Sequence, residues 1–153
     1  MRLNYAKILP AAPQVLAEVE KLVARSTLDP GLVELVKLRS SQINGCAVCV
    51  DMHTKDARAL EEEEQRLHLV AVWREAPCFS ERERAALAWS EAITLLPTSG
   101  APDDVYQDLT TVFSPEEIVT LTLAIALINV WNRLSVGFRR PAGDYVSTRR
   151  PAA

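Results

Sequence analysis

The stretch Ser114–Trp131, SPEEIVTLTLAIALINVW, decides the fold that the sequence predicts. It opens with a serine that can cap a helix, a proline at the first helical position and two acids at the positive end of the helix dipole. From Ile118 onward the stretch is apolar nearly all round. A helix of this kind is normally buried, so we expect it to lie at the centre of the molecule.

Six further segments repeat apolar residues at spacings of three and four, which is typical of amphipathic helices. Their expected ranges are 14–25, 30–43, 46–60, 67–73, 80–96 and 105–112. No segment shows the apolar–polar alternation that marks a strand between turns. The predicted fold class is therefore all-α, a single-domain helical bundle of about seven helices.

The chain has 153 residues, of which 48% are apolar and 24% charged, and this suits one domain with a sizeable core. We expect the core at about 14–140, with an irregular arm at 1–13 and a solvated tail at 141–153. The net charge of −3 and the scattered basic residues argue against nucleic acid as a partner. The N-terminus lacks the apolar run of a signal peptide, and the apolar run 118–131 is too short for a bilayer. These features predict a cytoplasmic protein with no membrane contact.

Residues 44–58, NGCAVCVDMHTKDAR, carry two of the three cysteines and one of the two histidines. Cys46, Cys49 and His53 stand at i, i+3 and i+7, on one face of a helix that starts after Gly45. Thiols in the cytoplasm stay mostly reduced, so a Cys-x-x-Cys pair there is more often catalytic or metal-binding than a structural crosslink. The spacing favours a dithiol redox centre.

Acid–base partners stand close to this pair. His53 follows Cys49 by four residues, within one helical turn, where its imidazole can accept the thiol proton. Such a base needs an orienting or proton-accepting neighbour, and Glu34 on the preceding helix is the candidate. Cys46 would lie at a helix N-terminus, where backbone donors and the dipole favour a thiolate. We expect it to be the more exposed sulfur, suited to exchange with a reductant.

Other kinds of site also contain a Cys-x-x-Cys pair. Haem attachment needs a histidine directly after the second cysteine, where this chain has Val50, and a thioredoxin-like site needs a βαβ context. Zinc could use both cysteines and His53 with Cys78 or His68 as fourth ligand, but there is no second close ligand pair. A pair of buried structural thiols is the remaining alternative. No metal or cofactor is predicted, Cys78 is expected to be an inert buried thiol, and His68 is expected to be packed or partly exposed.

These features together resemble the alkylhydroperoxidase AhpD-like, carboxymuconolactone decarboxylase superfamily. The residues that carry the resemblance are Glu34, the motif Cys46-x-x-Cys49-x-x-x-His53, and the phrases 43–46, 51–55 and 129–133. The likeness covers about residues 14–140. It is specific for the redox branch, because the decarboxylases proper lack the cysteine pair.

The resemblance implies an AhpD-like helical domain and a thiol-dependent peroxidase that works without a cofactor. Cys49 would attack a hydroperoxide and become a sulfenic acid, and Cys46 would resolve it to a disulfide that an external dithiol, protein or small molecule, reduces. His53 and Glu34 would relay the proton. The helix dipole favours Cys46 as the attacking thiol, whereas the family and the adjacent base favour Cys49, and we follow the latter.

Family members assemble as trimers or hexamers, so the resemblance also implies a homo-oligomer. Asn129, Asn132 and Arg133 on the apolar helix need partners if they are buried, and we expect a subunit interface near the site to supply them.

One position departs from the family pattern. The best-studied AhpD proteins carry a second relay histidine just before the second cysteine, where this chain has Val48. Two other functions therefore stay open. A redox-sensing or adaptor protein would form the same disulfide without turning over peroxide, and a carboxymuconolactone-type decarboxylase would need neither cysteine.

Overall fold

The computed structural model describes residues 1–150, and in that range the regular elements are all helices. They are α1 (Tyr5–Ile8), α2 (Ala11–Ala24), α3 (Pro30–Ile43), α4 (Ala47–Ala59), α5 (Glu64–Leu69), the 3-10 helix η1 (Val70–Val72), α6 (Glu81–Thr94), α7 (Leu96–Ser99), α8 (Asp103–Val112) and α9 (Pro115–Gly137). The all-α prediction is confirmed. Residues 151–153, the end of the expected tail, lie outside the described residues.

All seven predicted helices are present, and capping chemistry explains where two of the longest begin. Ser114 forms a capping box with Glu117 at the start of α9, and Ser80 does the same with Glu83 at the start of α6. The segment predicted at 67–73 is divided between α5 and η1. Local hydrogen bonds of capping side chains therefore set where α6 and α9 begin.

Two short helices, α1 and α7, were not expected. Pro97 lies in the first turn of α7, where its missing N–H group costs no hydrogen bond, so the chain is helical beyond residue 96, where the predicted helix ended. Asn4 caps α1 by accepting from the N–H of Lys7, and α2 already begins at Ala11. Much of the segment expected to be an irregular arm is therefore helical.

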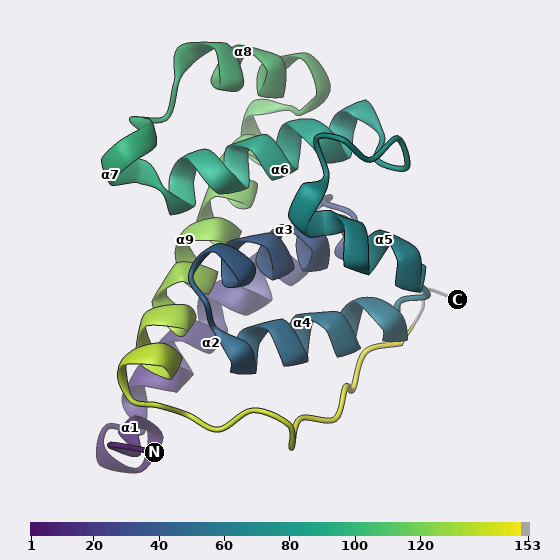
Figure 1. Cartoon of the computed structure of the whole chain (residues 1–153). Coiled ribbons are helices and arrows are strands. Elements are labelled where there is room, and N and C mark those ends of the chain that lie inside the picture. The colour runs from purple at the N-terminus through teal and green to yellow at the C-terminus, as the bar shows by residue number, and fades with distance from the viewer. Residues whose placement is uncertain (151–153) are drawn as a thin grey trace.

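The other helices are arranged around α3 (Figure 1). α4 and α6 pack on it, and α9 packs against α2, α3 and α6. Every residue from Leu32 to Leu38 is buried, so α3 is the buried central helix. The sequence assigned that position to α9, but Val119, Leu123 and Val130 of α9 are exposed because the neighbouring helices leave one of its faces uncovered.

α9 has 23 residues and runs on to Gly137, past the apolar run at 118–131. By length and composition it could cross a membrane, so the expectation that this segment is too short was wrong. Of its most apolar window, 56% is buried inside the molecule, and core helices meet the same criteria. Packing against three other helices accounts for its apolar character.

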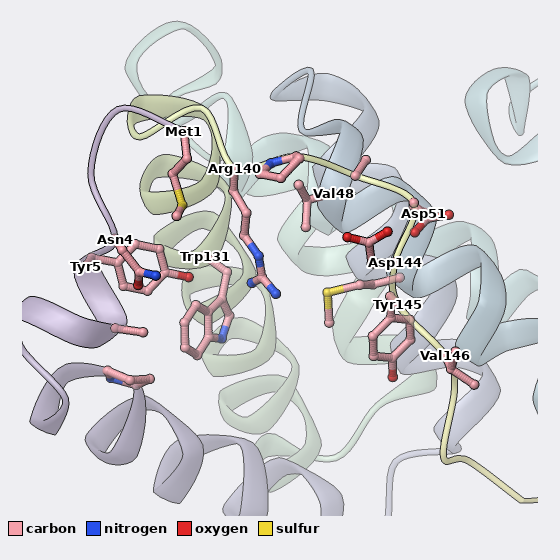
Figure 2. Close-up of a pocket in the computed structure, with 16 residues that line it drawn as sticks. Met1, Asn4, Tyr5, Val48, Asp51, Trp131, Arg140, Asp144, Tyr145 and Val146 are labelled. Atoms are coloured by element: carbon pink, nitrogen blue, oxygen red, sulfur yellow. The ribbon is translucent and has the colours of Figure 1, made fainter.

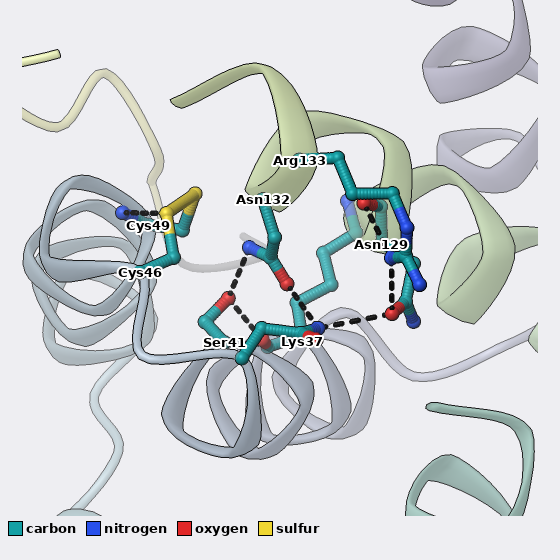
Figure 3. Close-up of a disulfide and its surroundings, with 8 residues drawn as sticks. Lys37, Ser41, Cys46, Cys49, Asn129, Asn132 and Arg133 are labelled. Atoms are coloured by element: carbon teal, nitrogen blue, oxygen red, sulfur yellow. Dashed lines mark hydrogen bonds between the residues drawn. A yellow bond between two sulfur atoms is a disulfide. The ribbon is translucent and has the colours of Figure 1, made fainter. Parts of the chain in front are cut away.

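A network of side-chain amides ties the end of α3 to α9 (Figure 3). Nδ2 of Asn44 donates to Oδ1 of Asn129 at 2.9 Å and to Oδ1 of Asn132 at 2.8 Å. Asn132 donates to Oγ of Ser41 at 3.1 Å, and Asn129 donates to Oγ1 of Thr94 at 3.1 Å. These partners belong to the same chain, so the expectation that a subunit interface supplies them was wrong.

Replacing Asn132 by alanine is expected to destabilise the fold by about 2 kcal/mol, because it leaves polar groups of Asn44 and Ser41 without their partner. Urea unfolding followed by circular dichroism measures the loss. Arg133→Ala is the control, since Arg133 is exposed and, within residues 1–150, its side chain bonds only to Asn129. That change is expected to stay within about 0.5 kcal/mol. Equal stability of Asn132→Ala and the wild type would contradict a structural role for the network.

Candidate functional site

A sharp break between α3 and α4 places the first cysteine. Asn44 caps α3, and Gly45 adopts φ +63°, a left-handed conformation that glycine takes without steric cost. Cys46 is then the N-cap of α4, and its sulfur accepts a hydrogen bond from the N–H of Cys49 at 3.4 Å. Both sulfurs therefore lie at the first turn of α4.

Cys46 and Cys49 are joined by a disulfide, and their Cα atoms are 5.4 Å apart (Figure 3). Both residues are buried, with 1% and 4% of their surfaces exposed. The prediction that Cys46 is the more exposed was therefore wrong. The reason is that the helix start carrying Cys46 packs against Ile128 of α9, with Met52 and Trp131 beside it.

Glu34 and His53 meet across the α3–α4 contact. Nδ1 of His53 lies 2.7 Å from Oε2 of Glu34, and both residues are buried. The bond uses one ring nitrogen, so Nε2 remains for exchange with a substrate or a thiol. The structure thus brings together all four residues that the sequence singled out, Glu34 with His53 and Cys46 with Cys49.

The environment of Glu34 keeps its carboxylate charged. Burial raises the pKa of Glu34, but the hydrogen bond from His53 and the positive charges of His53, Lys37 and Arg149 outweigh it, so the pKa lies below the ordinary value of 4.5. Lys37 is itself buried and pairs with Glu20 at 2.6 Å. Near neutral pH the partner of His53 is therefore an anion, suited to orient the ring and to stabilise its protonated form.

The two sulfurs border different cavities. Cys49 and His53 line a cavity of about 140 Å³ together with Met52, Trp131, Ile128, Glu20, Ser135 and Arg140. Cys46 instead borders a pocket of about 310 Å³ that includes Val48 and Arg139. Cys49 therefore shares a cavity with His53, and Cys46 borders a different pocket.

The last described residues run along α4 and reach the site (Figure 1). The hydroxyls of Tyr145 and Ser147 donate to Oδ1 of the buried Asp56 at 2.7 and 2.6 Å. Nη2 of Arg149 donates to Oε1 of Glu34 at 3.1 Å. The expectation of a solvated tail was thus wrong for this part of the segment, because buried carboxylates need donors and the segment supplies them.

Sequence reasoning missed Asp56, Tyr145 and Arg149. Asp56 follows His53 by three residues on the face that carries Cys49, so helical spacing could have indicated it. Tyr145 and Arg149 contact partners 89 and 115 residues away, and no local pattern links such positions. Burial and the hydrogen bond to Asp56 raise the pKa of Tyr145 to about 12, so its hydroxyl stays a donor at neutral pH.

The geometry does not favour the zinc alternative. His68 is exposed and pairs with Glu64 at 3.3 Å, and Cys78 is exposed as well. The expectation that Cys78 is buried was therefore wrong, because Phe79 enters the core in its place. Neither residue lines the cavities at the disulfide.

One other set of donors has metal-like spacing within residues 1–150. Single donor atoms of Glu34, His53 and Asp56 lie within 4.8 Å of one another. Each of the three already has a hydrogen-bond partner, and the guanidinium of Arg149 on Glu34 opposes a further cation. The set is better suited to hold protons than a metal ion.

Comparison with known proteins places the fold. Residues 10–92 match the carboxymuconolactone decarboxylase family. The chain is 42% identical over 143 residues to the uncharacterized protein YdfG of Bacillus subtilis, covering 94% of this chain and 97% of that one. A protein of unknown function from Agrobacterium tumefaciens, suggested to be the antioxidant defence protein AhpD, is 47% identical with a TM-score of 0.90 over 94% and 99% of the two chains. The debrominase Bmp8, 19% identical with a TM-score of 0.80 over 88% and 73%, shares the fold alone.

Replacing Arg149 by glutamine is expected to raise the pKa of Glu34, because a positive charge and a donor are lost. A carboxyl whose folded pKa lies below its unfolded pKa stabilises the fold above the unfolded pKa, and this contribution disappears as pH falls through the folded pKa. Arg149→Gln should therefore lower the free energy of unfolding at pH 7 by about 1 kcal/mol, and the difference should vanish below the folded pKa of Glu34.

Urea unfolding between pH 7 and pH 3 measures this difference. Arg150→Gln is the control, since it removes the same charge from a side chain whose contact is the carbonyl of Arg149. A loss of stability in Arg149→Gln that is the same at all pH values, or equal to that of Arg150→Gln, would contradict the assigned pairing.

Proposed function

The chain belongs to the carboxymuconolactone decarboxylase family, and we propose that it is a thiol-dependent peroxidase that reduces organic hydroperoxides through a Cys46–Cys49 dithiol–disulfide cycle. The observation that carries the proposal is the cavity shared by Cys49 and His53, with His53 held by the buried Glu34. Cys49 as nucleophile, His53 as base and Glu34 as the anion that orients the base thus form an arrangement that activates a thiol.

The first step takes place at Cys49. Nε2 of His53 accepts the thiol proton, and Glu34 stabilises the imidazolium that forms. The thiolate attacks the distal oxygen of the hydroperoxide, the O–O bond breaks, and Cys49 becomes a sulfenic acid. The leaving alkoxide takes the proton back from His53 and departs as an alcohol. The peroxide is reduced by two electrons and the sulfur is oxidised by two.

The second half of the cycle restores the thiols. The sulfur of Cys46 attacks the sulfenic sulfur of Cys49, which forms the disulfide and releases water. An external dithiol then supplies two electrons and two protons and becomes a disulfide itself. Cys46 is the sulfur suited to this exchange, because it borders the separate pocket next to Arg139. The assignment of Cys49 to peroxide and Cys46 to reductant rests on this division of the two cavities.

The proposal extends to the partners. The cycle needs a hydroperoxide and an external dithiol reductant, and we place the protein in the cytoplasm, where such dithiols are kept reduced. We further propose a homo-oligomer, a trimer or a hexamer, in which a second copy covers exposed apolar residues of α9. These residues are Val119, Leu123, Val130 and Val136.

The other two functions predict different results. A redox-sensing or adaptor protein would form the disulfide under oxidation but show negligible peroxide consumption in the presence of excess dithiol. A decarboxylase would keep its activity after both Cys46 and Cys49 are changed to serine. The polarised His53 in the cavity of Cys49 favours turnover over sensing alone.

Cys49→Ser is expected to abolish the reduction of cumene hydroperoxide by dithiothreitol, because the attacking sulfur is gone. His53→Gln should lower kcat/KM about a hundredfold, which is typical of the loss of a general base. Cys46→Ser should accumulate a sulfenic acid on Cys49 that dimedone labels, detectable by mass spectrometry. Following peroxide consumption with a colorimetric assay tests the first two.

Cys78→Ser is the matched control, since Cys78 is exposed, outside the disulfide and not in contact with either cavity. Its activity should equal that of the wild type. Turnover that survives in Cys49→Ser, or that depends on Cys78, would overturn the proposed cycle.

A further inference from the structure

Arg140 stands where the cavities of the site meet. It lines the cavity of Cys49 and His53 and the pocket of Cys46. It also lines a larger pocket of about 590 Å³ between α1, α4, α9 and the C-terminal segment, which we call the vestibule. Figure 2 shows its guanidinium extending into the vestibule beside Trp131. The same cation thus borders the vestibule and both pockets that adjoin the disulfide.

The guanidinium of Arg140 has no hydrogen-bond acceptor or carboxylate partner among residues 1–150. The carboxylates nearest to these cavities are mostly engaged elsewhere. Glu20 pairs with Lys37 at 2.6 Å, and Asp51 pairs with Lys55 at 2.9 Å. Asp144 borders the vestibule from the exposed C-terminal segment. Arg140 is therefore available to an anion that enters from solvent.

The walls around this cation are largely apolar. Met52, Trp131 and Arg140 line both the vestibule and the cavity of Cys49, so the two spaces are adjacent. Val48 and Tyr5 add apolar surface to the vestibule (Figure 2). A ligand that combines an apolar body with one anionic group would use both the apolar walls and the guanidinium of Arg140. A neutral alkyl hydroperoxide would leave the guanidinium unused.

We propose that the preferred substrates are organic hydroperoxides that carry a carboxylate, with the carboxylate bound by Arg140 and the apolar body against Trp131 and Met52. This inference rests on the proposed peroxidase function. A planar guanidinium binds a carboxylate through two parallel hydrogen bonds, which orients the ligand as well as attracting it. Such binding directs the hydroperoxide group away from the vestibule and towards Cys49.

A matched pair of substrates tests the inference: cumene hydroperoxide and its para-carboxylate analogue. The wild type should show a kcat/KM about fivefold higher for the carboxylate, which is what a solvent-accessible ion pair contributes, and the preference should shrink at high salt. Arg140→Gln should bring the two values together by lowering that of the carboxylate alone. Asp144→Asn should increase the preference, because a competing negative charge is removed from the vestibule.

Binding is measured separately from turnover by calorimetric titration of the disulfide form with 4-isopropylbenzoate, which cannot react. Affinity that falls about fivefold in Arg140→Gln supports the anion site. Arg150→Gln is the control for charge, because Arg150 lies on the same segment and its guanidinium donates to the backbone carbonyl of Arg149. It should leave kcat/KM and binding unchanged.

Equal kcat/KM for both hydroperoxides in the wild type, unaffected by Arg140→Gln, would overturn the carboxylate preference and leave the peroxidase function intact. Absence of turnover with either hydroperoxide would instead overturn the peroxidase function, and the inferred substrate class would fall with it.

Discussion

The hydrogen bond between His53 and Glu34 is the constraint on which the rest of the site depends. A buried carboxylate is costly unless donors and positive charges surround it, and here they come from three parts of the chain. His53 supplies the bond at 2.7 Å from α4, Lys37 lies one turn along α3, and Arg149 reaches back from the C-terminal segment. The negative charge of Glu34 is stable only when these elements pack together. The packing of α3 against α4 and the ionisation of Glu34 therefore depend on each other.

The break between α3 and α4 fixes the direction in which α4 starts. Gly45 turns the chain, and Asn44 is bonded to Asn129 and Asn132 of α9, so the start of α4 is fixed in direction. With α4 fixed, helical spacing alone carries Cys49 and His53 to one cavity. Cys46, as the N-cap, opens on another pocket. The Cys-x-x-Cys spacing therefore gives two residues that form a disulfide and yet border different pockets.

The sequence predicted what is encoded locally. Capping residues and apolar spacing located seven helices, and i, i+3, i+7 spacing predicted the face shared by Cys46, Cys49 and His53. Glu34 was a candidate because a base needs a neighbouring carboxylate and Glu34 lies on the preceding helix, and the resemblance to a known family supported that choice. Exposure was predicted less well: Cys46 is buried and Cys78 is exposed, since both depend on which distant helix covers them. The contact of Arg149 with Glu34 has no local pattern at all, because it spans 115 residues.

Because residue 48 is a valine, the contacts that keep Glu34 charged matter more to the proposed cycle. Val48 occupies the position of the second relay histidine, and it packs with the disulfide and Ile128 as an apolar residue. Val48 offers no second imidazole at this position, so the proposed cycle depends on one base, His53, rather than two. That base is effective only while its carboxylate partner is charged. Without a second histidine, the proposed proton transfer relies on the groups that keep Glu34 ionised. In this protein they include Arg149, which lies on the C-terminal segment far outside the motif.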